Sequence, residues 1–99
     1  MSDFIVFGGI NMDLFAYVPR STQEGETIEA SSVEFYLGGK GANQAVALSR
    51  LGAEVSFVGT LGKDQFGKEL EALVSAEKID LKNLRKQDGQ SGVALILSL

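Results

Sequence analysis

The order of apolar and polar residues along the chain predicts an α/β fold. Apolar residues run without a break from Phe4 to Phe7, and Glu54–Gly59, which contains Val55, Phe57 and Val58, predicts a second core strand. Runs of this length are typical of strands buried on both faces of a parallel sheet. Between them, Ala42–Leu51 carries apolar residues at helical spacing, and Gly52 stands where a helix commonly ends. This strand, helix, strand order predicts parallel pairing through a right-handed crossover.

The second half of the chain continues the alternation. Asp64 is predicted to cap a second helix, whose apolar face carries Phe66, Leu70, Leu73 and Val74. Ile79, Leu81 and Leu84 predict the approach to a short third strand, whose limits the intervening polar residues do not define, and Asp88-Gly89 predicts a turn. The apolar stretch Val93–Leu99 predicts a last strand. Because an unpaired apolar strand invites aggregation, we expect the sequence to stop inside a larger fold.

Two stretches between the first strand and the first helix differ from these core strands. They are Gly25–Glu29 and Val33–Leu37, and in the second one Val33, Phe35 and Leu37 alternate with more polar neighbours. A period of two is typical of a half-exposed strand. We therefore expect the two stretches to pair as an antiparallel flap beside the main sheet.

Composition and charge exclude several classes of function. With 99 residues, 44% hydrophobic content and one proline, the chain predicts at most one folded domain. A net charge of -4 argues against nucleic acid as a partner. The absence of cysteine and histidine excludes disulfides, thiolate or imidazole zinc sites and Ser-His or Cys-His nucleophiles within this sequence. Asp3 stands where a signal peptide needs positive charge, and the apolar run after it is too short to span a bilayer, so we expect a cytoplasmic location without membrane contact.

A glycine-rich segment directly before the first helix predicts a binding site. It contains Gly38, Gly39 and Gly41 together with Lys40 and Asn43. The free amides and partial positive charge of a helix N-terminus favour an anion or a hydroxyl-rich ligand, and a nearby ammonium adds to this. The amide of Asn43 can donate and accept at once, which suits a polyol. An ordinary strand-to-helix turn with a solvated lysine explains a glycine cluster of this kind equally well.

Asn11 and Asp13 follow the first strand, where ligands gather in open α/β sheets. On their own residue types, a turn residue for Asn11 and a helix or turn cap for Asp13 are the simpler interpretations. Their position alone makes both residues candidates for binding but does not favour binding over these simpler interpretations.

Two segments imitate nucleotide-binding motifs. Gly62–Glu69 matches a P-loop except at its last position, where Glu69 replaces the hydroxyl that would hold magnesium. We expect Gly62 and Gly67 instead to serve a turn and close helix packing. Gly39–Gln44 supplies two glycines of the dinucleotide fingerprint, but Gln44 stands where the third small residue is needed. Neither segment therefore predicts a nucleotide site.

Several motifs in order resemble the ribokinase family of sugar and nucleoside kinases, also called the PfkB family. They are Gly8–Asp13 for the first sugar-binding segment, Gly25–Thr27 for the lid turn, Gly38–Asn43 for the N-terminal signature, Val58–Gly67 for a Gly-x-Asp-x-x-Gly stretch and Ser91–Ile96 for the second lid segment. The resemblance implies a mostly parallel core sheet flanked by helices, with a small β lid. Residues 1–99 would be the N-terminal segment of one such domain, with lid strands at about 25–37 and 92–99.

The resemblance also implies roles for individual residues. Asn11 and Asp13 would hydrogen-bond the sugar hydroxyls, and the rest of the pocket would be formed by Gly38, Gly39, Lys40 and Asn43 at the polar edge and by Ala94 and Ile96 at the apolar face. The lysine of the signature and the Asn-x-Asp pair are most similar to members that act on ribose. One departure is that Thr22–Glu24 stands where prolines often precede Gly-Glu-Thr, which affects the rigidity of the lid.

The implied activity is transfer of a phosphoryl group from ATP to ribose, giving ribose 5-phosphate, with Mg²⁺ and a monovalent cation such as K⁺. The family's catalytic aspartate lies in a Gly-Ala-Gly-Asp segment that residues 1–99 do not contain. We therefore expect no catalytic, nucleotide-binding or metal-binding residue in this chain, which should be inactive alone, and a homodimer through the lid in the intact protein. Two alternatives stay open: another kinase of the family, acting on fructose, ketodeoxygluconate or a nucleoside, or a non-catalytic sugar-binding or lid-mediated interaction module.

Overall fold

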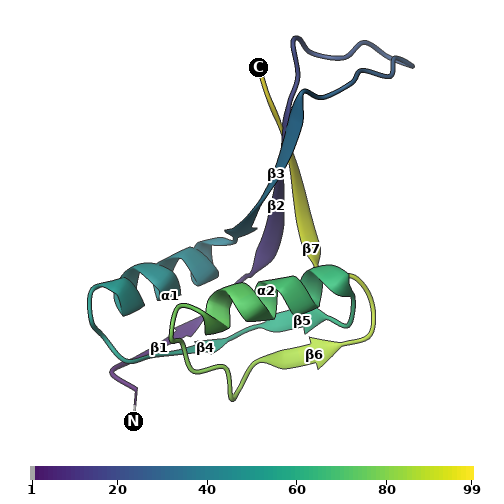
Figure 1. The fold of residues 1–99 in the computed structure, drawn as a ribbon. Coiled ribbons are helices and arrows are strands. Elements are labelled where there is room, and N and C mark those ends of the chain that lie inside the picture. The colour runs from purple at the N-terminus through teal and green to yellow at the C-terminus, as the bar shows by residue number, and fades with distance from the viewer. Residues whose placement is uncertain (1) are drawn as a thin grey trace.

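A narrow β lid rises from an α/β body in the computed structural model, which describes residues 2–99 (Figure 1). The body contains two parallel strand pairs and two helices, in chain order β1 (Phe4–Phe7), α1 (Lys40–Arg50), β4 (Val55–Val58), β5 (Thr60–Gly62), α2 (Gln65–Ser75) and β6 (Arg85–Gln87). The lid is a three-stranded sheet of β2 (Asn11–Tyr17), β3 (Ser32–Gly38) and β7 (Gly92–Ser98). The chain thus leaves the body twice to build the lid.

The predicted crossover is confirmed in the body. Strands β1 and β4 run parallel, in a register that sets Phe4 against Val55, and α1 connects the lid back to this pair. Helix α1 ends at Arg50 with Leu51 as its C-cap residue, and Gly52 follows with a φ of 98°, the left-handed conformation that favours glycine. The largest fully buried side chains gather where the helices meet the strands and the base of the lid; they are Met12, Phe57, Leu61, Leu70 and Val74.

The prediction that β1 is buried on both faces is wrong for residues 2–99. Only Val6 of this strand is buried, whereas Ile5 is 71% exposed and Phe7 is 83% exposed. Both helices lie on the same side of the body strands (Figure 1), so they cover Val6 and leave the opposite side of β1 bare. Strand β1 therefore carries apolar side chains on both faces, and only one of these faces is covered within residues 2–99.

The predicted third strand begins at Arg85, directly after the residues that lead into it. Ile79–Leu84 does not form a strand: Asp80 makes an isolated bridge to Ser56, and the chain then turns, with the N–H of Leu84 donating to the carbonyl of Leu81 at 3.0 Å. Leucines 81 and 84 pack on the core as anchors of this turn. The strand is β6, which pairs in parallel with β5, a short strand that the sequence pattern did not predict.

The lid also differs in part from the prediction. Strand β3 and strand β7 are confirmed, but Gly25–Glu29 is not a strand. Its predicted place beside β3 is taken by β2, which lies at the centre of the lid, antiparallel to β3 and parallel to β7. Asn11 and Asp13 therefore lie within a strand and not in the loop after β1.

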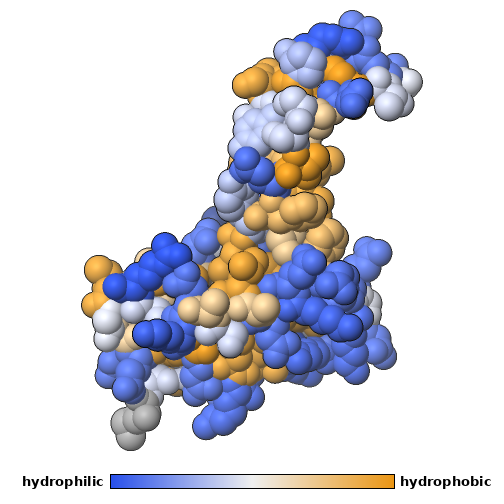
Figure 2. Space-filling model, in the orientation of Figure 1, coloured by the Kyte–Doolittle hydropathy of each residue, from blue (hydrophilic) through white to orange (hydrophobic). Residues whose placement is uncertain are grey.

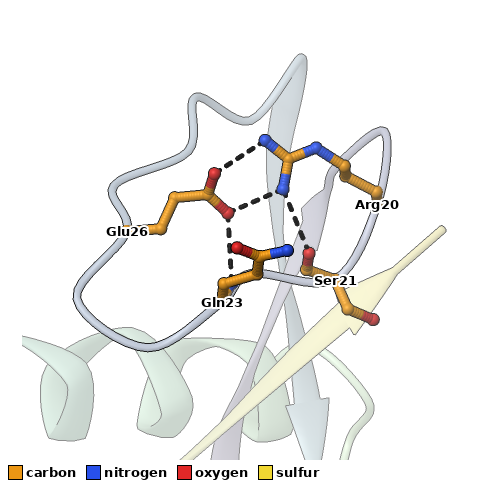
Figure 3. A network of polar contacts seen from close by, with 4 residues as sticks. All are labelled: Arg20, Ser21, Gln23 and Glu26. Atoms are coloured by element: carbon orange, nitrogen blue, oxygen red, sulfur yellow. Dashed lines mark hydrogen bonds and ion pairs between the residues drawn. The ribbon is translucent and has the colours of Figure 1, made fainter.

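A polar network at the lid tip holds the turn at Thr22–Glu24, a segment that contains no proline. The guanidinium of Arg20 donates to both carboxylate oxygens of Glu26, at 2.6 and 2.7 Å, and the N–H of Gln23 donates to the same carboxylate at 3.1 Å (Figure 3). Arg20 lowers the pKa of Glu26 below its ordinary value, and the Gln23 N–H adds to this effect. This two-point contact orders the tip, although exposed ion pairs contribute little to global stability.

Asp64 connects α2 to the first residues of the lid strand β7. Its carboxylate accepts from the N–H of Gly67 at 2.8 Å, which caps α2 as predicted, and from the N–H and hydroxyl of Ser91 at 2.9 and 2.8 Å. A Cβ on Gly67 would overlap the carbonyl oxygen of Gly62. The segment that imitates a P-loop is therefore a turn with close helix packing, as predicted.

The hydrogen bonds from Ser91, with a smaller contribution from Gly67, lower the pKa of Asp64 below its ordinary 3.8. The folded state thus favours the ionised carboxylate, so this stabilisation is complete above about pH 4 and is lost as the pH falls through the lowered pKa. We expect the melting temperature of Asp64→Asn to fall less steeply below pH 3.8 than that of the parent protein. Asp88→Asn is the control, because the side chain of Asp88 is 96% exposed, and it should retain the parent slope. An identical slope for Asp64→Asn would contradict this assignment.

Within residues 2–99, neither helix has the length and apolar character needed to cross a membrane.

Candidate functional site

The site begins where two glycine-rich turns touch backbone to backbone. A Cβ on Gly41 would lie 2.8 Å from the Cα of Gly8, and one on Gly39 would lie 2.6 Å from the carbonyl oxygen of Gly9. Gly39 also has a φ of 99°, which L-residues rarely adopt. The N–H of Ala42 donates to the carbonyl of Gly9 at 3.0 Å. The start of α1 is thereby fixed against the end of β1, and only glycine allows this approach.

The N-terminus of α1 has no side-chain cap. Gly39 is the N-cap residue and provides no side-chain cap, and the first turn contains no acidic residue. Lys40 and Asn43 stand in this first turn and are exposed. The partial positive charge of the helix end and the Lys40 ammonium therefore reinforce each other beside an accessible amide side chain.

Asn11 and Asp13 reach the same place from the first residues of β2. The side-chain amide of Asn11 donates to Oδ1 of Asp13 at 2.6 Å. A Cβ on Gly38 would lie only 2.5 Å from Cγ of Asp13, so the carboxylate covers the bare Cα of Gly38. One oxygen of Asp13 is thus oriented by Asn11, and a carboxylate can accept further hydrogen bonds from a ligand.

The pairing of the lid strands places apolar side chains beside the Asn11–Asp13 pair. Asp13 lies between Tyr36 of β3 and Ala94 of β7, and Ile96 follows two residues further along β7, across from Phe15. Directly opposed residues share one face of a sheet. We call this side of the sheet the site face of the lid; it carries Asn11, Asp13, Phe15, Tyr36, Ala94 and Ile96. We call the opposite side the outer face; it carries Val33, Phe35, Val93, Leu95 and Leu97.

Of the eight candidates, Asn11, Asp13, Gly38 and Ala94 are direct neighbours at the joint between the lid and the body. Gly39, Lys40 and Asn43 follow Gly38 in the turn and the first turn of α1, and Ile96 lies two residues beyond Ala94 along β7. The polar ones are Asn11, Asp13, Lys40 and Asn43, the backbone ones Gly38 and Gly39, and the apolar ones Ala94 and Ile96. Acceptors, donors, an ammonium and a small apolar surface in one place suit a small polyhydroxylated ligand. Among residues 2–99, no three acidic side chains gather closely enough to hold a metal ion.

Sequence reasoning missed that Phe15 and Tyr36 belong to the same face as Asp13. The signal was present, because in Asn11–Tyr17 the apolar Met12, Leu14 and Ala16 alternate with the other positions. The preceding Gly8-Gly9 pair suggested a turn and masked this alternation.

Comparison with known proteins decides the family. The family model for pfkB family carbohydrate kinases matches residues 1–98. The chain belongs to this family. It is 40% identical over 92 residues to the ribokinase of Haemophilus influenzae, covering 92% of this chain and 30% of that protein. It is also 42% identical over 64 residues to the deoxyribokinase of Salmonella typhimurium, covering 65% of this chain and 21% of that protein.

Solved structures of pfkB-family members share the fold of this chain. A structure of Arabidopsis thaliana ribokinase complexed with ribose and ATP superposes with a TM-score of 0.89 at 32% identity, over 97% of this chain and 32% of that one. A ribokinase from Giardia lamblia gives a TM-score of 0.88 at 33% identity, over 98% of this chain and 32% of that one. The ribokinase-like fold is thereby confirmed, and the chain spans about a third of the length of these relatives.

Proposed function

We propose that the longer protein to which this chain corresponds is an ATP-dependent kinase that phosphorylates ribose to ribose 5-phosphate. The observation that carries the proposal is the contact of the Asn11–Asp13 pair with the glycine turn that opens α1. It joins a charged acceptor to an uncapped helix end and Lys40. Membership of the pfkB family and the ribokinases among its relatives support this choice of substrate.

In this proposal, different residues of the site contact different parts of the sugar. Asn11 and Asp13 bind its hydroxyl groups, and the polar edge of the ring lies against Gly38, Gly39, Lys40 and Asn43. Ala94 and Ile96 cover the apolar face of the sugar from β7. A pocket built on hydroxyl contacts discriminates strongly against an analogue that leaves its buried polar groups unpaired.

The other half of the reaction belongs to residues outside this chain. In the proposal residues 1–99 are the N-terminal segment of a single domain, and the catalytic base and the groups that bind ATP, Mg²⁺ and K⁺ lie in the remainder. Phosphoryl transfer requires both substrates to be positioned together. Residues 1–99 alone should therefore bind the sugar weakly and transfer nothing. The proposed location of the protein is the cytoplasm.

A substrate panel tests the choice of sugar. The full-length protein is assayed with ATP and Mg²⁺ against ribose, deoxyribose, fructose, ketodeoxygluconate and adenosine. Ribose should give the highest kcat/KM. A higher value for any other substrate would replace ribose in the proposal and keep the kinase activity.

We further propose that the intact protein forms a homodimer through the outer face of the lid. Leu95 on this face is 67% exposed, Phe35 is 55% exposed and Leu97 is 48% exposed. Figure 2 shows apolar surface along the lid down to α2, where Met12, Phe35, Phe66 and Leu73 line a groove. A contiguous apolar patch of this kind marks an interaction site, and two copies related by a two-fold axis could bury it.

Leu95→Lys tests the proposed dimer. A charge at the centre of an apolar interface should convert the full-length protein from dimer to monomer in light scattering coupled to gel filtration. The matched control is Leu51→Lys, because Leu51 is 85% exposed but lies at the end of α1 in the body. A monomeric parent protein, or a Leu95→Lys protein that stays dimeric, would contradict the proposed interface.

A further inference from the structure

Two aromatic side chains stand beside the polar centre of the candidate site. Tyr36 lies directly across from Asp13 in the β2–β3 register, and Phe15 is two residues further along β2. Their rings meet edge to face, with centroids 5.3 Å apart and planes at 86°. Because opposed residues of antiparallel strands hold their Cβ atoms about 4.5–5.5 Å apart, this aromatic pair begins beside Asp13 in the sheet and extends from there toward the lid tip, where Glu34 lies.

The Tyr36 ring is held in place from two sides. Phe15 restrains its plane, and its hydroxyl donates to the carboxylate of Glu34, which also accepts from the hydroxyl of Tyr17 at 3.5 Å. The bond to Glu34 raises the pKa of Tyr36 above its ordinary 10.0, so the hydroxyl keeps its proton at neutral pH. With 47% of Tyr36 exposed, a fixed aromatic surface remains available to a ligand.

The two cross-strand neighbours of Asp13 differ in the size of their side chains. On β3 its neighbour is Tyr36, whereas on β7 its neighbour is Ala94. A ligand whose hydroxyl groups bind Asp13 therefore has room on the Ala94 side and meets a ring on the Tyr36 side. A larger substituent on the Tyr36 side would approach that ring, whereas one on the Ala94 side would meet only a methyl group.

We infer that Tyr36, supported by Phe15, is a specificity-determining wall of the sugar site, which favours a five-carbon sugar over larger substrates. The inference rests on the proposed sugar site and adds a residue to it. One extra or missing methylene in an apolar pocket discriminates by about 10–200-fold, and an effect of this size is expected where a ring limits the space for a substrate. The wall therefore has a measurable effect on substrate choice, separate from the hydroxyl recognition by Asp13.

The test compares the full-length parent protein with Tyr36→Ala and Tyr36→Phe. We expect Tyr36→Ala to raise kcat/KM for fructose or adenosine relative to ribose by about tenfold or more. Tyr36→Phe keeps the ring and should leave this ratio within about twofold. Tyr17→Ala, on the same face but further toward the tip, should also leave it unchanged. An unchanged ratio in Tyr36→Ala would overturn the inference.

Binding measurements separate this inference from the proposed kinase activity. Calorimetric Kd values for ribose and fructose are measured on the parent protein and on Tyr36→Ala, with Phe15→Leu as a second variant that also weakens the wall. The ratio of the two Kd values should shift toward fructose in both variants. A parent protein that binds fructose as tightly as ribose, or ratios that do not move, would overturn the inference. Absence of turnover with every sugar would instead refute the kinase, and the Kd ratios would still decide the role of Tyr36.

Discussion

Asp13→Asn is expected to lower kcat/KM for ribose by about a hundredfold or more, because hydrogen bonds to a charged acceptor are each worth about 1.5–3 kcal/mol. The asparagine has nearly the same shape and retains the position above Gly38. It loses the negative charge and presents one acceptor oxygen in place of two. The loss should therefore come from weaker sugar hydroxyl contacts and not from a change in the fold. Steady-state kinetics of the full-length protein with ribose as the varied substrate measure the effect.

The matched control for this substitution is Asp88→Asn. It makes the same chemical change at a side chain that is 96% exposed, in the turn before β7. Its kinetic constants should equal those of the parent protein. If Asp13→Asn retained kcat and KM within about twofold, Asp13 would have to be removed from the sugar site.

Gly39→Ala is expected to lower both the stability and the activity of the protein, because two independent costs combine at this position. A Cβ would be forced into a φ of 99° and would lie 2.6 Å from the carbonyl oxygen of Gly9. Left-handed strain costs about 1–2 kcal/mol, and overpacking against a fixed backbone adds about 1–3 kcal/mol. The free energy of unfolding, measured by denaturant titration, should fall by about 2–5 kcal/mol.

Two controls separate the two costs. Gly25→Ala has a φ of 75° but no atom within 4 Å of the new Cβ, so it should lose only the strain contribution. Gly9→Ala meets no atom within 4 Å either and is not in the left-handed region, so its stability should change little. A Gly39→Ala protein as stable as Gly25→Ala would show that the turn relaxes, and the close contact between the glycine turns would lose its structural role.

The elements that the sequence predicted well are those with an unambiguous local period. Helix α2 and its Asp64 cap follow from an apolar face at helical spacing after a capping residue, and both are confirmed. The parallel pairing of β1 and β4 follows from strand, helix, strand order. The turn and close helix packing at Gly62 and Gly67 also followed from sequence, since Glu69 removed the P-loop interpretation, and the structure adds that the two glycines touch.

The elements that the sequence did not predict depend on contacts between distant residues. Strand β2 is a strand because β3 and β7 pair with it from both sides, and β7 lies about eighty residues away in the chain. The position of the third strand depends on β5, a partner of three residues that has no clear pattern of its own. The exposure of Ile5 and Phe7 depends on which face of β1 the helices cover, and the apolar sequence of the strand does not specify this.

The candidate site shows the same division. Residue type and position made Asn11, Asp13, Lys40 and Asn43 candidates, but the family resemblance was needed to prefer binding roles for Asn11 and Asp13. Tyr36 was not found, because its relation to Asp13 exists only in the register between β2 and β3. Sequence motifs therefore suggested the candidate hydroxyl-binding groups, and the tertiary fold was needed to relate Tyr36 to Asp13.

The most direct measurement of the central claim is the product formed by the full-length protein from ribose and ATP with Mg²⁺. Phosphorus NMR follows the appearance of a sugar phosphomonoester while ADP is quantified in the same reaction. Ribose 5-phosphate and ADP should appear in equal amounts, and Asp13→Asn should suppress both. Calorimetric binding of ribose without any phosphomonoester or ADP would contradict the proposed kinase and favour a non-catalytic sugar-binding protein.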